Sequence, residues 1–264
     1  MIIDEESPLD IALRLAADEP AHRPDFYKKL LESTVYILGK SENQIEGAQT
    51  IAPGEKISIQ NWEKNDGSPV IPFFSTLIKL QTILDKETSY LALPARSLFE
   101  ITKGSSLVLN PKLKYGKEFF PNEIEALLTY NVNRLAEQRV TQKETQVLLG
   151  QPATYPSKMV ESLTAFFSIR NNVKAAYLAM MHDPSQDEKP HLIVGIEVDG
   201  DYVQIIREAG VVAGDTNLNG EPVDLIRVDP NEQGLSKYFK RDVKPFYERS
   251  WGGKLKFVLG IGHA

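Results

Sequence analysis

Cysteine is absent from the 264 residues of this chain. Its absence excludes disulfide bonds, thiolate metal ligands, cysteine nucleophiles and thiol redox chemistry. A chain without disulfides is compatible with any compartment and fits a reducing cytosol well. We therefore expect a cytoplasmic protein.

Long apolar runs are missing as well. No stretch approaches the roughly 20 residues that a membrane-spanning helix needs. The opening residues, MIIDEESPLD, turn acidic at once and contain neither a basic nor an apolar region of the kind found in a signal peptide. We expect no signal peptide and no membrane partner.

Recognisable catalytic motifs are also lacking. The sequence has no GxGxxG, no GxSxG and no HExxH. Its nearest approaches to a phosphate-binding loop are Gly116-Lys117-Glu118 and Gly253-Lys254-Leu255, and neither supplies the Ser or Thr that would hold magnesium. The sequence thus predicts no cofactor and favours a non-enzymatic function.

Positive charge is in short supply. The chain has 36 acidic and 30 basic residues, a net charge of −6. Nucleic-acid binding and electrostatic membrane binding both need concentrated Lys and Arg, so we expect neither. The hydrophobic fraction of 42% is that of an ordinary globular protein.

The first part of the chain predicts alternating helices and strands. Ser7 can cap a helix that begins at Pro8, and Asp66-Gly67 favours a tight hairpin turn. Pro72 indicates an edge strand, because proline cannot donate a ladder hydrogen bond. In order, we expect helices over 8–18 and 24–32, a strand over 34–38, a loop over 39–53, a hairpin over 57–74 and a helix capped by Ser75.

The stretch from Tyr90 to Leu128 has the clearest boundaries. It predicts a strand over 90–93, a helix from Pro94, a strand over 106–109, a polar loop over 112–118 and a helix from Pro121. Arg96 either binds an anionic partner or pairs with Glu100 one turn on. The candidate interaction surface of this half consists of Arg96, Asn110, Lys112, Lys117 and Glu118.

The second half restarts the pattern after a polar connection over 129–144. We expect strands over 147–150, 173–181, 192–198 and 223–228, with helices over 156–168 and 202–212 and loops over 182–190 and 214–222. This βαββαβ order is that of ferredoxin-like sandwiches. The sequence therefore predicts an α+β protein with two α/β-sandwich-like domains and mixed sheets, at 1–138 and 139–264.

Two histidines are the first candidates for a metal site. His182 and His191 flank the polar turn and could meet beside Asp183. An exposed pair in a turn offers fewer ligands than a tetrahedral site needs. We predict no metal there.

Three carboxylates form a second candidate cation site. Glu197, Asp199 and Asp201 lie between a strand end and the helix that starts at Tyr202. Capping of that helix explains them more simply than a carboxylate cation site does.

Two aromatic groups could mark binding surfaces. Trp62, Phe73 and Phe74 either form a patch or, as we favour, cover the hairpin core. The segment PFYERSWGGKL (residues 245–255) carries Tyr247, Arg249 and Trp251, the residue types that anchor protein interfaces. It either presents these side chains to a partner or docks on its own domain.

Several segments together resemble the bacterial enhanced serine sensitivity family, SseB. EPAHRPDFYKKLLESTVY, NWEKNDGSPVIPFFS, LALPARSLFEI and LVLNPKLKYGKEFFPNEI are similar to its N-terminal domain. LLGQPATYPSKMVESLTAFF, LIVGIEVDGD and PFYERSWGG are similar to its C-terminal domain. The resemblance implies a cytoplasmic bacterial protein linked to a serine-sensitivity phenotype, with no established reaction, cofactor or catalytic residue.

Three functions stay open on this basis. The first is a non-enzymatic interaction or regulatory protein with a protein partner, anchored first by Arg249 and Trp251, and able to form an oligomer. The second is a binder or enzyme of amino-acid or sulfur metabolism, with Lys112 and Lys117 facing a carboxylate ligand. The third is an immunity or secretion-associated accessory protein, whose acidic charge would suit a basic partner.

Overall fold

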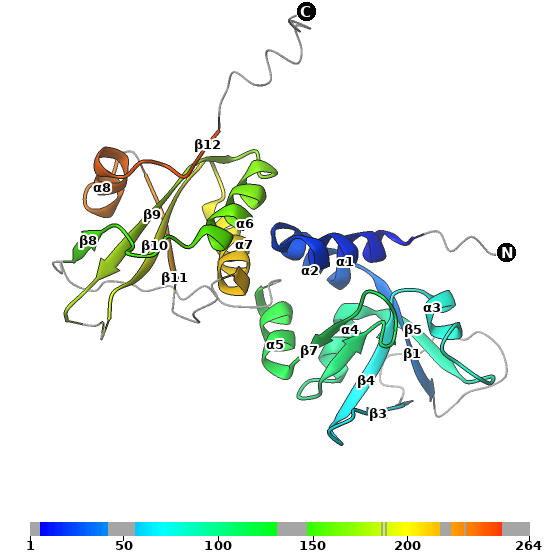
Figure 1. The fold of residues 1–264 in the computed structure, drawn as a ribbon. Helices are drawn as coiled ribbons and strands as arrows, with labels where there is room; N and C mark the ends of the chain where they lie inside the picture. Colours follow the sequence, from blue (N-terminus) through cyan, green and yellow to red (C-terminus); the bar gives the residue numbers. More distant parts are fainter. Residues whose placement is uncertain are drawn as a thin grey trace, which may run out of the picture. The chain divides into compact units, whose positions relative to one another are not determined.

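The computed structural model describes residues 6–41, 56–130, 147–185, 187, 189–216, 223–229 and 231–249. The chain divides into two compact units, Met1–Leu135 and Ala136–Ala264, and each has its own sheet (Figure 1). The predicted α+β class is confirmed. The predicted boundary at 138/139 lies outside the described residues. None of the helices described is long and apolar enough to cross a membrane.

The first unit opens with two packed helices. α1 (Pro8–Asp18) starts at Ser7, whose hydroxyl accepts a hydrogen bond from the Asp10 amide, as predicted. A short 3-10 turn, η1 (Pro20–His22), leads into α2 (Arg23–Leu31), which packs against α1. Both helices bury an apolar face, because their leucines and aromatics recur at helical spacing.

The sheet of this unit is mixed and is built around β1 (Thr34–Ser41), whose last residues the sequence assigned to a loop. β1 pairs antiparallel with three strands: β2 (Ile57–Ile59), β4 (Pro69–Phe74) and β5 (Tyr90–Pro94). β4 continues the sheet in parallel to β6 (Leu107–Leu109), and β6 pairs antiparallel with β7 (Lys117–Phe119).

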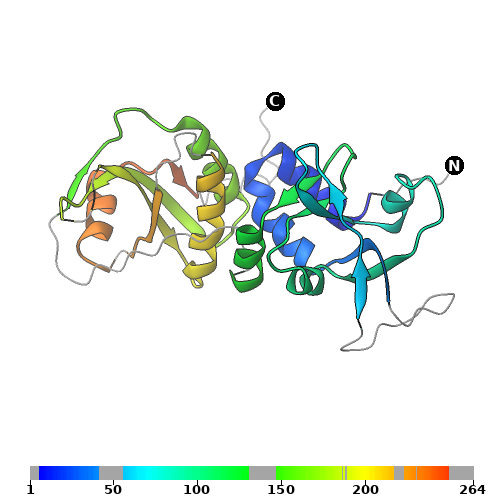
Figure 2. The ribbon, with the colours of Figure 1, turned by 90° about the horizontal axis from the view of Figure 1, so that it is seen from below.

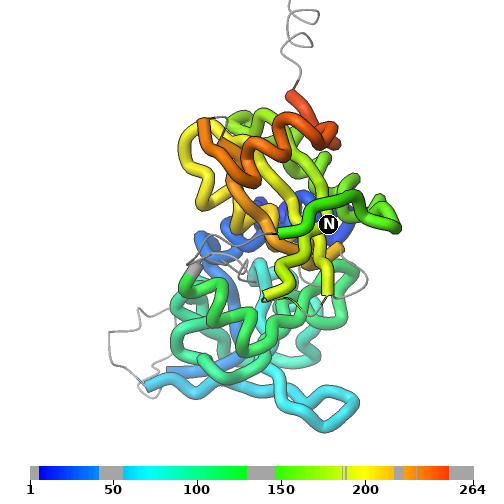
Figure 3. The backbone as a smooth tube through the Cα atoms, turned by 90° about the vertical axis from the view of Figure 1, so that its left-hand side faces the viewer, coloured from blue at the N-terminus to red at the C-terminus, as the bar shows by residue number. Residues whose placement is uncertain are grey.

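The predicted hairpin is confirmed only in part. β3 (Trp62–Glu63) turns through Asp66-Gly67 and pairs antiparallel with β4 (Figure 3, cyan). β2, the expected start of the hairpin, pairs with β1 instead.

The placement of Pro72 in an edge strand was wrong, because β4 lies between β1 and β6. Pairing with β3 ends at Val70 and pairing with β1 begins at Phe73. On the side of β6, the backbone bonds fall on the Ile71 amide and the Phe73 carbonyl. Proline is tolerated inside the sheet here because neither ladder needs its missing N–H.

Three further helices complete the first unit: α3 (Leu77–Gln81), α4 (Ala95–Ile101) and α5 (Pro121–Tyr130). Thr76, not Ser75, caps α3, because its hydroxyl accepts from the Lys79 amide at 3.2 Å. A buried aromatic cluster holds the layers together, and its closest members include the rings of Phe99 and Phe119, 5.5 Å apart.

The second unit follows the predicted βαββαβ order and then adds two elements. In order, it contains β8 (Leu148–Gly150), α6 (Ser157–Ser168), β9 (Val173–His182), β10 (His191–Val198), α7 (Tyr202–Thr216), β11 (Val223–Arg227), α8 (Leu235–Asp242) and β12 (Tyr247–Glu248). α7 runs three residues into the expected loop at 214–222. The sequence interpretation missed α8, whereas β12 agrees with its alternative that the C-terminal segment docks on its own domain.

The strand order of this sheet is β11-β10-β9, with β12 and β8 both pairing with β9 at its opposite ends. β10 and β11 are parallel and the other pairs are antiparallel. α6 and α7 pack together on one face (Figure 2, green and yellow), and α8 covers the other (Figure 1).

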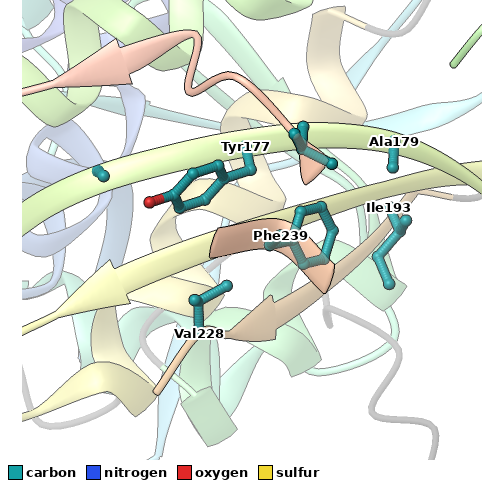
Figure 4. Close-up of a cluster of buried hydrophobic side chains, with 7 residues drawn as sticks. Tyr177, Ala179, Ile193, Val228 and Phe239 are labelled. Atoms are coloured by element: carbon teal, nitrogen blue, oxygen red, sulfur yellow. The ribbon is translucent and has the colours of Figure 1, made fainter. Parts of the chain in front are cut away.

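α8 approaches the sheet closely because of Gly195. A Cβ on Gly195 would lie 2.7 Å from Val228 Cγ2 and 2.9 Å from Phe239 Cδ2. The missing side chain leaves room for Phe239, which is fully buried beside Tyr177 and Ile193 (Figure 4). Figure 3 traces the chain from β11 through α8 to β12 in orange and red.

Candidate functional site

The loop between β6 and β7 combines left-handed backbone with a close approach of its two ends. Two of its residues, Asn110 (φ 49°) and Lys112 (φ 63°), have left-handed backbone conformations. These are the non-glycine residues with positive φ in the part of the chain that the structure describes. Such conformations cost free energy and persist only where the surroundings hold them.

Gly116 closes this loop. A Cβ at that position would lie 2.9 Å from the carbonyl oxygens of both Leu109 and Asn110. Only glycine allows the returning strand to approach the outgoing strand so closely. The loop therefore has one tight conformation, fixed at both ends.

Asn110 anchors the loop from beneath and is fully buried. Its Oδ1 accepts from the Ser75 amide at 3.0 Å, and its Nδ2 donates to Ser75 Oγ at 3.1 Å. Its Nδ2 also lies 3.4 Å from Asp10 Oδ1. The sequence interpretation placed Asn110 on the interaction surface, and the structure places it in the interior below that surface.

Asp10 is the charged centre of this buried network. The Ser75 hydroxyl donates to its Oδ1 at 2.5 Å, Lys79 Nζ lies 2.6 Å from the same oxygen, and the Ser7 hydroxyl donates to Oδ2 at 2.7 Å. Burial by itself raises the pKa of Asp10, but the hydrogen bonds from Lys79, Ser75 and Ser7 outweigh it and lower the pKa below 3.8. The carboxylate is therefore held in its charged form.

Sequence reasoning assigned Ser7 and Ser75 to helix caps and Lys79 to no role. The contacts of Asp10 with Ser75 and Asn110 join segments separated by 65 and 100 residues. No local sequence pattern predicts such a contact. A polar residue at a position that periodicity makes buried, as Asp10 is beside Leu9 and Leu13, is the one available signal.

Lys117 and Glu118 hold the far end of the loop. Lys117 Nζ lies 2.8 Å from Glu123 Oε1, and Lys64 Nζ donates to Glu118 Oε1 at 2.8 Å. Lys117 also lies over the ring of Phe119, 4.8 Å from its centroid. Both residues were predicted for the interaction surface, and their described contacts are with the unit itself.

Lys112 and Lys114 differ from these residues. Both side chains are exposed, and neither has a carboxylate contact among the described residues. Lys112 Nζ lies 5.0 Å from the centroid of the Trp62 ring, and Lys114 Nζ lies 5.0 Å from that of Tyr115. We call these four side chains the lysine platform.

Trp62 connects the platform to the core. The sequence interpretation was that this residue covers the core of the hairpin. Its ring packs edge-on against Phe74, with 6.5 Å between centroids. Phe73 and Phe74 are completely buried, whereas Trp62 is half-buried. One part of the indole is thus core and the other supports Lys112.

Arg96, near the start of α4, is half-buried. Its Nη1 donates to the Leu128 carbonyl at 3.2 Å, which ties α4 to α5. The sequence suggested that Arg96 either binds an anionic partner or pairs with Glu100. The hydrogen bond to the Leu128 carbonyl is neither of these contacts.

Tyr247 and Arg249 dock on their own unit. Arg249 donates from Nη2 to the carbonyls of Phe167 (2.9 Å) and Arg170 (2.7 Å), and from Nε to that of Val173 (2.9 Å). Tyr247 donates its hydroxyl to the Phe167 carbonyl at 3.0 Å. The carbonyls of Phe167 and Arg170, at the end of α6 and just beyond it, also accept backbone hydrogen bonds from the amides of Arg170 and Val173, so the two side chains add further donors there. Trp251 lies outside the described residues.

The two histidines of the polar turn converge on one aspartate. His191 Nδ1 lies 3.5 Å from Asp187 Oδ2, and His182 Nε2 lies 3.2 Å from the Asp187 carbonyl. The other ring nitrogen of His191 lies 2.9 Å from Asp224 Oδ2. The described residues contain no group of three or more side chains able to hold a metal.

The three acidic residues before α7 have separate partners. Asp201 Oδ1 accepts from the Val203 amide at 3.1 Å, which is the capping role expected. Glu197 pairs with Lys240 at 2.8 Å and Asp199 with Lys174 at 2.7 Å.

Comparison with known proteins covers most of the chain. Residues 9–126 match the SseB protein N-terminal domain and residues 141–249 match the SseB protein C-terminal domain. The chain is 39% identical over 253 residues to "Protein SseB" of Escherichia coli (strain K12), covering 96% of each chain, and equally similar to "Protein SseB" of Shigella flexneri. No solved structure matches it.

Proposed function

The chain belongs to the SseB protein family, and we propose that it is a non-enzymatic interaction or regulatory protein of the cytoplasm that binds a protein partner on the segment Asn110–Glu118, which comprises the loop between β6 and β7 and the first two residues of β7. One observation carries this proposal. The loop is held rigidly from beneath, and it presents two exposed lysines without carboxylate contacts among the described residues.

Rigidity favours binding. A loop that already has its bound conformation loses little conformational entropy when a partner docks. Lys112 adds a second argument. Glycine would adopt its left-handed backbone without strain, so the lysine side chain has a use that offsets the strain.

The C-terminal anchors receive less support than the loop. Tyr247 and Arg249 already contact carbonyls at the end of α6. A partner that used the Arg249 guanidinium would have to replace these hydrogen bonds. We therefore favour the loop over Arg249 as the docking site.

A small carboxylate ligand, the second candidate, retains partial support. Lys112 could face such a ligand, but Lys117 is paired with Glu123. A thermal-shift series with serine and related acids tests this candidate, because binding to the folded state must raise the melting temperature. No shift at millimolar ligand argues against it.

Affinity purification tests the proposal directly. The tagged chain is isolated from its native cells as wild type, as Lys112→Glu/Lys114→Glu and as the control Lys28→Glu/Lys29→Glu, and bound proteins are identified by mass spectrometry. The control makes the same charge change on exposed residues of α2. We expect a reproducible partner with wild type and control that is lost with the loop variant. An unchanged partner set contradicts the proposal.

A further inference from the structure

Most cations around the loop are already neutralised. Lys64 pairs with Glu118, Lys79 with Asp10, and Lys117 with Glu123. Lys112 and Lys114, in contrast, point their ammonium groups at aromatic rings. Within the described part of the chain, these two ammonium groups therefore have no carboxylate partner, on a chain whose net charge is −6.

The aromatic rings fix where this charge lies. A lysine over an aromatic face is attracted by the ring quadrupole and keeps its hydrogen-bond donors free on the outer side. Trp62 is itself held against Phe74, and the loop backbone is held by Asn110. The donors of Lys112 are thus positioned before any ligand arrives.

We propose that the lysine platform binds an acidic peptide segment of a partner protein. Its two lysines, separated by one residue, would each contact a carboxylate of the segment. This inference rests on the proposed function and adds the chemistry of the partner. Charge complementarity supports it, since each contact would be a charge-assisted hydrogen bond.

A nucleic acid fits the same surface less well. Backbone phosphates need several neighbouring cations, and the platform offers two. A peptide can place its carboxylates on the lysines and keep the rest of its length neutral.

Trp62 provides a reporter inside the site. The chain has two tryptophans, so Trp251→Phe leaves Trp62 as the only one. Its fluorescence is followed while full-length Trp251→Phe is titrated with a hexaglutamate peptide at low salt. Hexaglutamine, free glutamate and a short oligothymidylate are titrated in parallel. The titrations are repeated in Lys112→Gln/Lys114→Gln and in the control Lys28→Gln/Lys29→Gln.

We expect saturable binding of hexaglutamate that weakens at about 0.15 M salt because exposed charges are then screened. Replacing the two lysines should weaken it at least about tenfold, since a hydrogen bond to a charged group is lost at each site. The control variant should bind as the parent does. Free glutamate should not saturate in the same range.

The inference is overturned if hexaglutamine binds as well as hexaglutamate, if the Lys112→Gln/Lys114→Gln variant binds equally, or if oligothymidylate alone saturates the site. Saturation by free glutamate at the same concentration assigns the site to a small carboxylate and overturns the peptide. If the native partner is lost from the Lys112→Glu/Lys114→Glu variant while hexaglutamate fails to bind, the proposed function stands and the acidic class is wrong.

Discussion

The side-chain amide of Asn110 lies 3.1 Å from the hydroxyl of Ser75, although 35 residues separate the two in the chain. Both side chains are buried. Through Asp10 they also connect the loop to α1. The position of the exposed lysines therefore depends on a polar network in the interior.

Two variants of Asn110 separate the contribution of its hydrogen bonds from that of its left-handed backbone. Asn110→Ala removes its hydrogen bonds and places alanine at positive φ, and we expect it to lower the free energy of unfolding by roughly 2–4 kcal/mol. Asn110→Gly removes the same hydrogen bonds without the left-handed strain of alanine, but it adds backbone freedom to the unfolded chain, so it should cost up to about 1 kcal/mol less. Urea denaturation measures both. Asn61→Ala, at an exposed position, is the control, and equal losses in all three variants would contradict the network's role.

Asp10 makes the stability of the first unit depend on pH in the acid range. Its pKa is lowered in the folded state below the ordinary 3.8, so its contribution is complete above that value and is lost as the pH falls through the folded pKa. Asp10→Asn should therefore destabilise the chain at pH 7 and less so at about pH 3. Urea unfolding of wild type and variant at both pH values measures the difference. A difference that does not shrink in acid would assign the effect to packing.

Glycine at position 112 tests whether the lysine is kept for binding. Lys112→Gly relieves the left-handed strain but loses the contact with Trp62 and adds backbone freedom to the unfolded chain. We expect a change in unfolding free energy within about 1 kcal/mol. The melting temperature reports the stability of the variant, and affinity purification shows whether the partner is still recovered with it. A variant that melts several degrees lower and also loses its partner would indicate a structural role instead.

Arg249 should matter for stability. Arg249→Ala leaves the carbonyls of Phe167 and Arg170 without their guanidinium donors, at an expected cost of roughly 1–3 kcal/mol. Arg249→Lys keeps the charge but cannot reproduce the planar set of donors, so it should recover little. Arg241→Ala, whose side chain is 71% exposed, is the control for chemical denaturation. If Arg249→Ala is as stable as the wild type, this prediction is wrong, and Arg249 could serve as an anchor for a partner instead.

His191 lies between two buried carboxylates, Asp187 and Asp224. Removing the imidazole by His191→Leu should destabilise the chain by roughly 3 kcal/mol, because both carboxylates lose a buried polar contact. Adding Asp224→Leu should restore part of this loss, since an apolar pair avoids the desolvation cost. His182→Leu, at a half-buried site, should cost less. If the double variant has a free energy of unfolding no higher than that of His191→Leu alone, this account is wrong.

Most of the elements followed from local signals. Ser7 before Pro8 marked the start of α1, and Asp66-Gly67 marked the β3–β4 turn, because capping and tight turns depend on neighbouring residues. α8 was missed although Leu235, Tyr238 and Phe239 have helical spacing. Strand partners could not be derived, because pairing joins residues far apart in the chain.

The sequence by itself determined that this is an α+β chain of the SseB family without cysteine chemistry, and it singled out the loop over Asn110–Glu118. Tertiary structure decided which of its residues reach the surface. It buried Asn110 beneath the loop, turned Arg249 onto the end of α6, and left Lys112 over Trp62. Periodicity and capping act within a few residues, whereas burial and hydrogen bonding depend on which distant segments meet.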